Sequence, residues 1–177
     1  MNWRIFKMKV IVERKVTFVK IGRNEQILPL EIRPLHKEVV DEARDLILAG
    51  FLERFGFIDH SLNPDLNDMM GTYGKEGHMF FVAFVDGELI ATGAVTKEDH
   101  RVGRIERMSV KGSYRRKGIG QRMLAKLEDS ARACKYESLV LETNNSWESA
   151  IRLYTTNGYR FVSDDGRRCH FEKRLQV

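Results

Sequence analysis

The pattern of hydrophobic and polar residues is strand-like at the start of the chain and then becomes helical. Residues 10–21 are rich in β-branched and aromatic types in rough alternation, which predicts an N-terminal strand. A shorter strand is predicted at 30–33. From His36, apolar residues recur at helical spacing as far as Gly50, so we expect a helix that ends at this glycine.

The segment after this helix has no clear periodicity. Residues 51–63 contain phenylalanines without regular spacing. Pro64 suits the first turn of a helix, so a second, short helix is predicted through residue 70. We therefore expect an irregular segment between two helices.

Strand-like patterns return after Gly77. Apolar runs at 79–85 and 88–95 flank Asp86-Gly87, a dipeptide typical of a tight hairpin, and a third strand is predicted at 102–110. The helix that follows Gly120 should bury one stripe of side chains: Met123, Leu124, Leu127, Ala131 and Cys134.

The rest of the chain alternates between the two types of element. Strands are predicted at 138–143, 159–162 and 168–175, with a helix at 148–156. This order predicts an α/β fold with a mixed sheet covered by helices. We expect 28–177 to form this single domain and 1–27 to be a strand-rich N-terminal extension.

Composition limits the class of protein. With 177 residues, 42% of them hydrophobic, the chain can bury one good core but is short for two domains. The formal net charge of +5 is a mild basic excess. Such a charge suits a phosphate-bearing ligand and is also compatible with weak nucleic-acid contact.

Cysteine spacing and hydropathy bear on metal binding and location. Cys134 and Cys169 form no CxxC pair and have no histidine at zinc-ligand spacing, so neither a metal site nor a disulfide is predicted. The longest apolar run, at 79–85, is far shorter than the roughly 20 residues of a transmembrane helix. The first nine residues lack the apolar core of a secretory signal. A cytoplasmic protein without a metal is expected.

A basic, glycine-containing turn joins the strand at 102–110 to the next helix. Such a turn aims unpaired backbone N–H groups at one point, where the helix dipole also favours an anion. Gly118 and Gly120 would let a ligand approach the backbone closely, because a β-carbon would intrude. As a bare pattern this is weak, since a solvated helix start looks the same.

Two longer segments carry a family resemblance. IERMSVKGSYRRKGIGQRML, at 105–124, resembles the acetyl-CoA-binding signature (R/Q)xxGx(G/A) of GNAT acyltransferases. LVLETNNSWESAIRLYTTNGYRF, at 139–161, is similar to the strand, AxxLY helix and Gly-aromatic turn that close the domain in that family. The resemblance implies a single-domain fold with a mixed, mostly antiparallel sheet flanked by helices.

The same resemblance implies acetyl-CoA as co-substrate, with no metal. The main chain of Met108 and Val110 should pair with the pantetheine arm, and N–H groups from Arg116 to Gln121 should hold the pyrophosphate. The full expected binding set is Met108, Ser109, Val110, Arg115, Arg116, Lys117, Gly118, Ile119, Gly120, Gln121, Arg122, Asn145 and Tyr154.

Two positions depart from the family pattern. Trp147 stands where many members have an asparagine that contacts pantetheine, and Asn144 or Asn145 is a possible substitute. Arg104 stands where some members have a glutamate. The catalytic base is therefore open.

Three residues are candidates for proton transfer. By its AxxLY position, Tyr154 is expected to protonate the coenzyme A thiolate. Glu142 matches a base position of an N-terminal-acetylating branch of the family, so we expect it to contribute more than Glu106. Strand alternation predicts Glu106 on the same side as Met108 and Val110. Either carboxylate can instead be an ordinary salt-bridge partner.

The function that these features favour is N-acetyl transfer from acetyl-CoA to an amine of a small molecule or peptide. The alternatives are a non-catalytic acyl-CoA-binding regulatory domain and, less favoured, a basic nucleic-acid-binding module. The segment 51–78 should shape the acceptor pocket, whose amine stays open. No membrane or nucleic-acid partner is expected, and a homodimer is possible.

Overall fold

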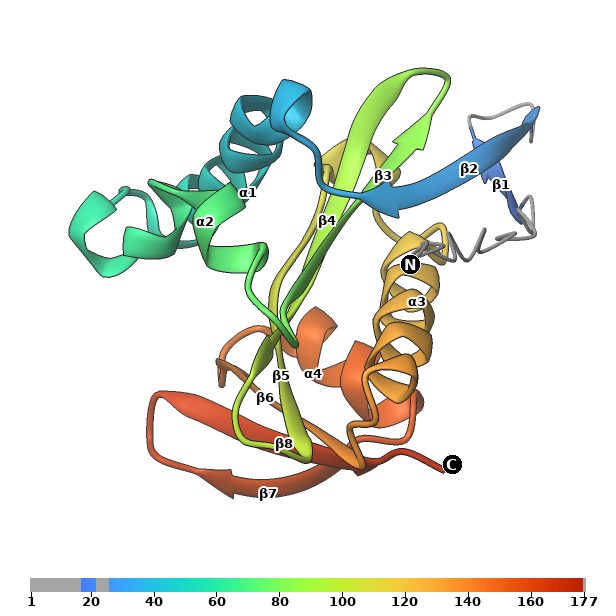
Figure 1. Cartoon of the computed structure of the whole chain (residues 1–177). Coiled ribbons are helices and arrows are strands. Elements are labelled where there is room, and N and C mark those ends of the chain that lie inside the picture. The colour runs from blue at the N-terminus through green and yellow to red at the C-terminus, as the bar shows by residue number, and fades with distance from the viewer. Residues whose placement is uncertain (1–16, 22–25, 177) are drawn as a thin grey trace, which may run out of the picture.

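The computed structural model describes residues 17–21 and 26–176, and within them eight strands form one sheet (Figure 1). The strand order is β1-β2-β3-β4-β5-β6-β8-β7. All neighbours are antiparallel except β5 and β6, which run parallel. The strands are β1 (Thr17–Ile21), β2 (Gln26–Pro34), β3 (Met79–Val85), β4 (Glu88–Lys97), β5 (Val102–Val110), β6 (Ser138–Asn144), β7 (Arg160–Asp164) and β8 (Arg168–Arg174). The predicted mixed, mostly antiparallel α/β fold is confirmed.

Helices cover both faces of the sheet, as Figure 1 shows for α1 and α2 on one side and α3 on the other. The α-helices are α1 (Val40–Phe55), α2 (Met69–Tyr73), α3 (Ile119–Ala133) and α4 (Glu148–Thr156). Short 3₁₀ turns are η1 (Lys37–Val39), η2 (His60–Leu62), η3 (Pro64–Leu66) and η4 (Gly112–Tyr114). In the part of the chain that the structure describes, no helix is long and apolar enough to cross a membrane.

Each face of the sheet has its own core. Under α3 and α4, side chains such as Met123, Leu127 and Phe171 are fully buried. Under α1 and α2, a second cluster includes Ala43, Ile47 and Met69 with the opposite face of β3 and β4. Both β3 and β4 are buried on both faces, which explains their nearly continuous apolar sequence.

The N-terminal predictions are only partly testable. Of the strand predicted at 10–21, residues 17–21 form β1, and 10–16 lie outside the described residues. The strand predicted at 30–33 is longer and runs from Gln26 to Pro34. The boundary proposed after residue 27 falls inside this strand.

The predicted end of the first helix at Gly50 is wrong, because α1 continues to Phe55. Its end is capped by Gly56, whose φ of 76° is the left-handed conformation that glycine adopts easily. Gly50 has a packing role instead: a β-carbon there would lie 3.1 Å from Ser109 Oγ on β5. The glycine lets α1 approach the sheet closely.

Two further details differ from the sequence predictions. The helix predicted from Pro64 is divided into η3 and α2, and the Asp68 side chain accepts a hydrogen bond from the Gly71 N–H at the start of α2. Cys134, predicted in the buried stripe of α3, is exposed because the helix ends at Ala133. The other four residues of that stripe are buried.

A β-bulge in β5 reverses which side chains face each side of the sheet. Thr92 pairs with Ser109 and Ala94 with Glu106, so two steps along β4 match three along β5. Arg107, at the bulge, has a φ of 53°, and its carbonyl oxygen accepts a 2.7 Å hydrogen bond from Thr92 Oγ1.

The bulge overturns the predicted orientation of Glu106. Glu106 pairs with Ala94, which belongs to the core under α1 and α2, whereas Met108 and Val110 pack against the core under α3. The extra residue shifts the alternation by one position, which moves side chains to the other face. Glu106 therefore does not share a side with Met108 and Val110.

The bulge also anchors the segment after α1. Arg107 donates from Nε to an Asp65 carboxylate oxygen at 2.9 Å and from a terminal nitrogen to Asn63 Oδ1 at 2.8 Å. The Tyr73 hydroxyl donates to the same Asp65 oxygen at 2.7 Å. The Arg107 and Asp65 side chains are only 17% and 18% exposed, so this network is largely shielded from water.

We expect Arg107→Ala to lower the free energy of unfolding by about 3–5 kcal/mol, because it leaves the shielded Asp65 charge without its partner. Urea denaturation measures this loss. Arg104→Ala, on the same strand but in the more exposed pair with Glu98, is the matched control and should cost under about 1 kcal/mol. Equal losses in the two variants would contradict the assigned role of Arg107.

Candidate active site

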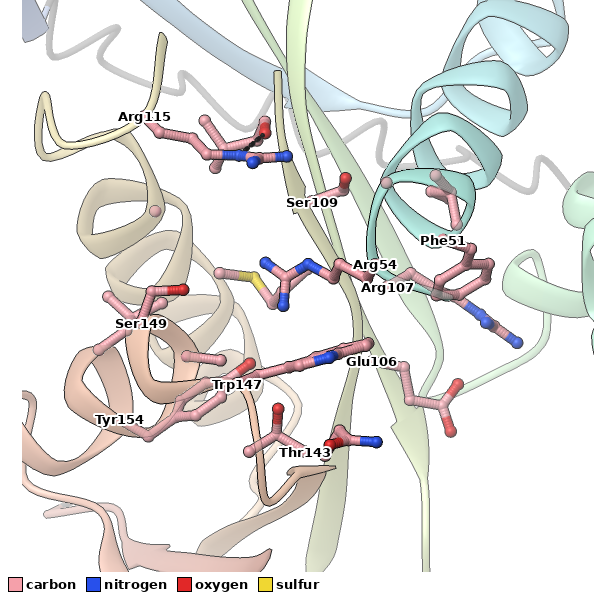
Figure 2. A pocket seen from close by; sticks show the side chains of 18 of the residues that line it. Phe51, Arg54, Glu106, Arg107, Ser109, Arg115, Thr143, Trp147, Ser149 and Tyr154 are labelled. Carbon is pink, nitrogen blue, oxygen red and sulfur yellow. Dashed lines mark hydrogen bonds between the residues drawn. The ribbon is translucent and has the colours of Figure 1, made fainter. Parts of the chain in front are cut away.

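The separation of β5 from β6 opens a large cleft. The two strands pair only from Val102 to Arg104 on β5 and from Ser138 to Val140 on β6. Beyond Arg104 a cleft of about 1420 Å³ lies between β5, the end of α1, the start of α3, and α4. Side chains from all these elements line it (Figure 2).

The basic turn forms one end of this cleft. Arg116 and Gly118 have φ values of 60° and 75°, and this pair of left-handed residues turns the chain into α3. Gly118 is the N-cap residue and supplies no side-chain cap. The first N–H groups of α3 therefore lie open at the cleft, where an anion would be held by the helix N-terminus.

The reasons for the two glycines in this turn differ. Gly118 has open space around its missing β-carbon, so its positive φ is what favours glycine. A β-carbon on Gly120 would meet Leu153 at 3.5 Å, an ordinary contact. Within the protein there is room at Gly120, so any crowding there would have to come from a ligand.

The basic side chains of the turn are mostly held by protein partners. Arg115 donates from Nε to the Val110 carbonyl oxygen at 3.0 Å and from a terminal nitrogen to Glu53 at 2.7 Å. The Lys117 ammonium donates to the Ser113 carbonyl oxygen at 2.8 Å. Arg122 donates to the main chain of β1 and does not line the cleft. The backbone of the turn is thus better placed than its side chains to meet a ligand.

Tyr154 is one of the residues that line the cleft. It comes from α4, and its ring packs edge-on against Tyr159 with centroids 5.6 Å apart. Figure 2 shows the side chain directed towards the middle of the cleft. Burial raises the pKa of the Tyr154 phenol, so it keeps its proton at neutral pH.

The two candidate carboxylates have different surroundings. Glu106 is half-buried, and burial raises the pKa of its carboxyl group, although the Arg107 charge acts in the opposite direction. Glu142 is exposed on β6 and forms an ion pair with Arg168. The His170 ring is also 4.0 Å from a Glu142 oxygen. Glu142 thus already has a cationic partner in Arg168, whereas Glu106 is partly desolvated.

Asn145 does not reach the cleft. Its side-chain nitrogen lies 3.4 Å from both carboxylate oxygens of Asp164 on β7, and it is not a lining residue. Asn144 does line the cleft. Ser109 lies at the cleft with its hydroxyl 3.5 Å from the Leu46 carbonyl oxygen of α1.

Trp147 and Arg54 form a contact across the cleft that sequence reasoning missed. The Arg54 guanidinium carbon lies 4.2 Å from the centre of the Trp147 ring, and Phe55 packs on the same ring with centroids 5.3 Å apart. Phe51 and Phe57 extend this aromatic group through Phe55. In the sequence, Trp147 stands out only as a departure from the family pattern, and Arg54 lies beyond Gly50, where the first helix is predicted to end.

The sheet is thus split at its parallel pair, and the N-terminus of α3 lies at the split. The family model described as Acetyltransferase (GNAT) family matches residues 39–159. The chain belongs to this family.

Relatives and solved structures agree with the assignment. The chain is 30% identical over 110 residues to the N-acetylaspartate synthetase of Danio rerio, covering 61% of this chain and 39% of that protein. It is 34% identical over 101 residues to the probable N-acetyltransferase 14 of Xenopus tropicalis, covering 55% and 48%. It thus spans less than half the length of these two relatives.

Two solved structures show the same fold. A GNAT-family acetyltransferase from Staphylococcus aureus Mu50 has a TM-score of 0.75 and 22% identity, covering 83% of this chain and 99% of that one. The PaiA N-acetyltransferase from Thermoplasma acidophilum, in complex with coenzyme A, has a TM-score of 0.69 and 18% identity, covering 82% and 98%.

Proposed function

We propose that this protein is an N-acetyltransferase that transfers an acetyl group from acetyl-CoA to an amine. The observation that carries the proposal is the placement of Tyr154 in a cleft that begins at the open N-terminus of α3. An anion-binding helix end and a protonated phenol in one cleft suit a phosphate-bearing thioester better than they suit a nucleic acid. The names of the two relatives support the same reaction.

The co-substrate would supply an activated acyl group, and the chain's own residues would handle charge and protons. The backbone from Arg116 to Gln121 would hold the phosphates. The amine nitrogen forms a bond to the acetyl carbon as the carbon–sulfur bond breaks. Tyr154 gives its proton to the departing thiolate, which prevents recapture of the acetyl group.

For the base we propose Glu106 ahead of Glu142, the reverse of the order expected from the sequence. A general base works best when its pKa lies close to the working pH, and burial shifts Glu106 in that direction. Glu142 is exposed, and its carboxylate is already engaged in an ion pair with Arg168.

Location and assembly stay predictions. The cysteine pattern favours a cytoplasmic protein, and a homodimer is compatible with the fold.

By its name, the relative N-acetylaspartate synthetase forms an acetylated amino acid.

Acetyl-CoA should stabilise the native protein by about 2.7 kcal/mol at a hundredfold excess over its dissociation constant, because only the folded state holds it. A thermal melt with and without acetyl-CoA measures the effect. Gly120→Leu should reduce the shift by blocking approach to the backbone. An unchanged melting temperature at millimolar acetyl-CoA would rule out the proposed co-substrate.

Tyr154→Phe should lower kcat by roughly ten- to a thousandfold and leave acetyl-CoA affinity almost unchanged, because it removes only the proton donor. Steady-state kinetics with a separate binding measurement tests this. A variant with wild-type kcat would show that Tyr154 only packs α4 against the sheet.

Glu106→Gln should lower kcat/KM by about 10²–10⁴-fold, the usual contribution of a positioned base, and Glu142→Gln should have a smaller effect. A base must be deprotonated to act, so wild-type activity should fall as the pH drops through the raised pKa of Glu106. Glu106→Gln should lose this acidic limb. If the acidic limb of the pH–rate profile disappears only in Glu142→Gln, then Glu142 is the base, as the sequence predicted.

A further inference from the structure

Several arginines line the cleft beyond the basic turn at 114–120, which we call the phosphate turn, and three of them are paired with carboxylates. Arg104 pairs with Glu98, Arg107 with Asp65, and Arg168 with Glu142. Within residues 17–21 and 26–176, no carboxylate lies within 4 Å of a nitrogen of Arg54, although Glu53 is its neighbour in sequence. Arg152 on α4 also lines the cleft without an ion pair, but it is Arg54 that stacks on Trp147.

Arg54 is held in a fixed orientation by an aromatic surface. Its guanidinium lies over the Trp147 ring at 4.2 Å, and Figure 2 shows it reaching across the cleft towards Trp147 while Arg107 points away. Stacking uses the face of a guanidinium and leaves the N–H groups at its edge available. These groups match the two oxygens of a carboxylate.

The wall beside Arg54 is apolar. Phe55 and Phe57 have exposed fractions of 44% and 60%, and both line the cleft with Phe51. Partial desolvation in this setting lowers the pKa of the Arg54 guanidinium, which stays charged at neutral pH. A bound anion would supply a counter-charge in direct contact with Arg54, which no carboxylate in the described part of the chain does; Glu53 acts on it only at longer range.

The anion could come from the acceptor or from the phosphates of the co-substrate. The phosphate turn already offers its own site at the N-terminus of α3, and Arg115 stands beside it, bound to Glu53 and Val110. Arg54 instead lies with the phenylalanines that follow it in the chain. Its surroundings therefore favour the acceptor.

We propose that Arg54, stacked on Trp147, binds the carboxylate of the acceptor, so that the acceptor is an amino acid whose apolar side chain packs on Phe51, Phe55 and Phe57. This inference rests on the proposed N-acetyltransferase function. The bound carboxylate places the acceptor's amine in the cleft that Glu106 and Tyr154 share.

The test compares L-phenylalanine with L-phenylalaninamide, which keeps the amine and ring but lacks the carboxylate. Arg54→Gln should raise KM for L-phenylalanine by about 10–150-fold, the cost of losing a charged hydrogen bond, and leave KM for the amide unchanged. For each acceptor, the KM of the variant is divided by the KM of the wild type. This ratio cancels the effect of the different basicities of the two amines. Arg54→Lys should give an intermediate KM, because a lysine keeps the charge but not the planar fork.

Two further variants separate recognition from general effects. Trp147→Leu should raise KM selectively for the acid, because the guanidinium loses its stacking surface. Arg160→Gln, which removes one positive charge on β7 outside the cleft, should leave KM unchanged for both acceptors. Acetyl-CoA affinity should be unchanged in Arg54→Gln.

Other outcomes overturn the inference. Equal effects of Arg54→Gln on acid and amide, or no effect on either, would exclude carboxylate recognition. Weaker acetyl-CoA binding in this variant would assign Arg54 to the phosphates. If the wild type transfers acetyl groups to neither compound, the acetyl-CoA melt still tests the proposed function separately, and calorimetry of L-phenylalanine binding with coenzyme A present still decides whether Arg54 holds a carboxylate.

Discussion

The parallel pairing of β5 with β6 lasts for three residues, and the cleft depends on where it stops. A parallel neighbour requires a crossover, which here is α3, so the start of this helix lies next to the strand end that leads into it. Beyond this pairing the two strands separate, and α4 and the end of α1 line the cleft between them. The basic turn, the Tyr154 phenol and the Glu106 carboxylate line one cleft because the sheet is divided at this point.

The bulge at Arg107 determines which side chains of β5 face α1 and which face α3. It directs Glu106 to the α1 side while Met108 and Val110 pack towards α3. The same residue fixes the segment after α1 through Asp65 and Asn63. Arg107 therefore links the geometry of β5 with the position of the segment that follows α1.

Much of this was predictable from the sequence, because it depends on local signals. The hairpin at Asp86-Gly87, the turn into α3 and the position of Tyr154 follow from turn chemistry, helix periodicity and a family signature. The orientation of Glu106 was not, since no residue type marks the bulge: Arg107 adopts a positive φ only because Thr92 and Asp65 hold it. The length of α1 was misjudged because Gly50 serves packing against Ser109, a contact between residues far apart in sequence.

The way in which α1 ends has a consequence for how such a protein can diversify. Gly50 fixes the helix to β5, Glu53 ties it to Arg115, and Gly56 ends it with nothing crowding the missing β-carbon. The residues between Gly56 and the anchor at Asn63 and Asp65 can therefore change in sequence or number without moving the turn into α3, since surface loops tolerate such changes at little entropic cost. Under the proposed function, related proteins could then differ in the acceptor that they bind while binding the same co-substrate in the same way.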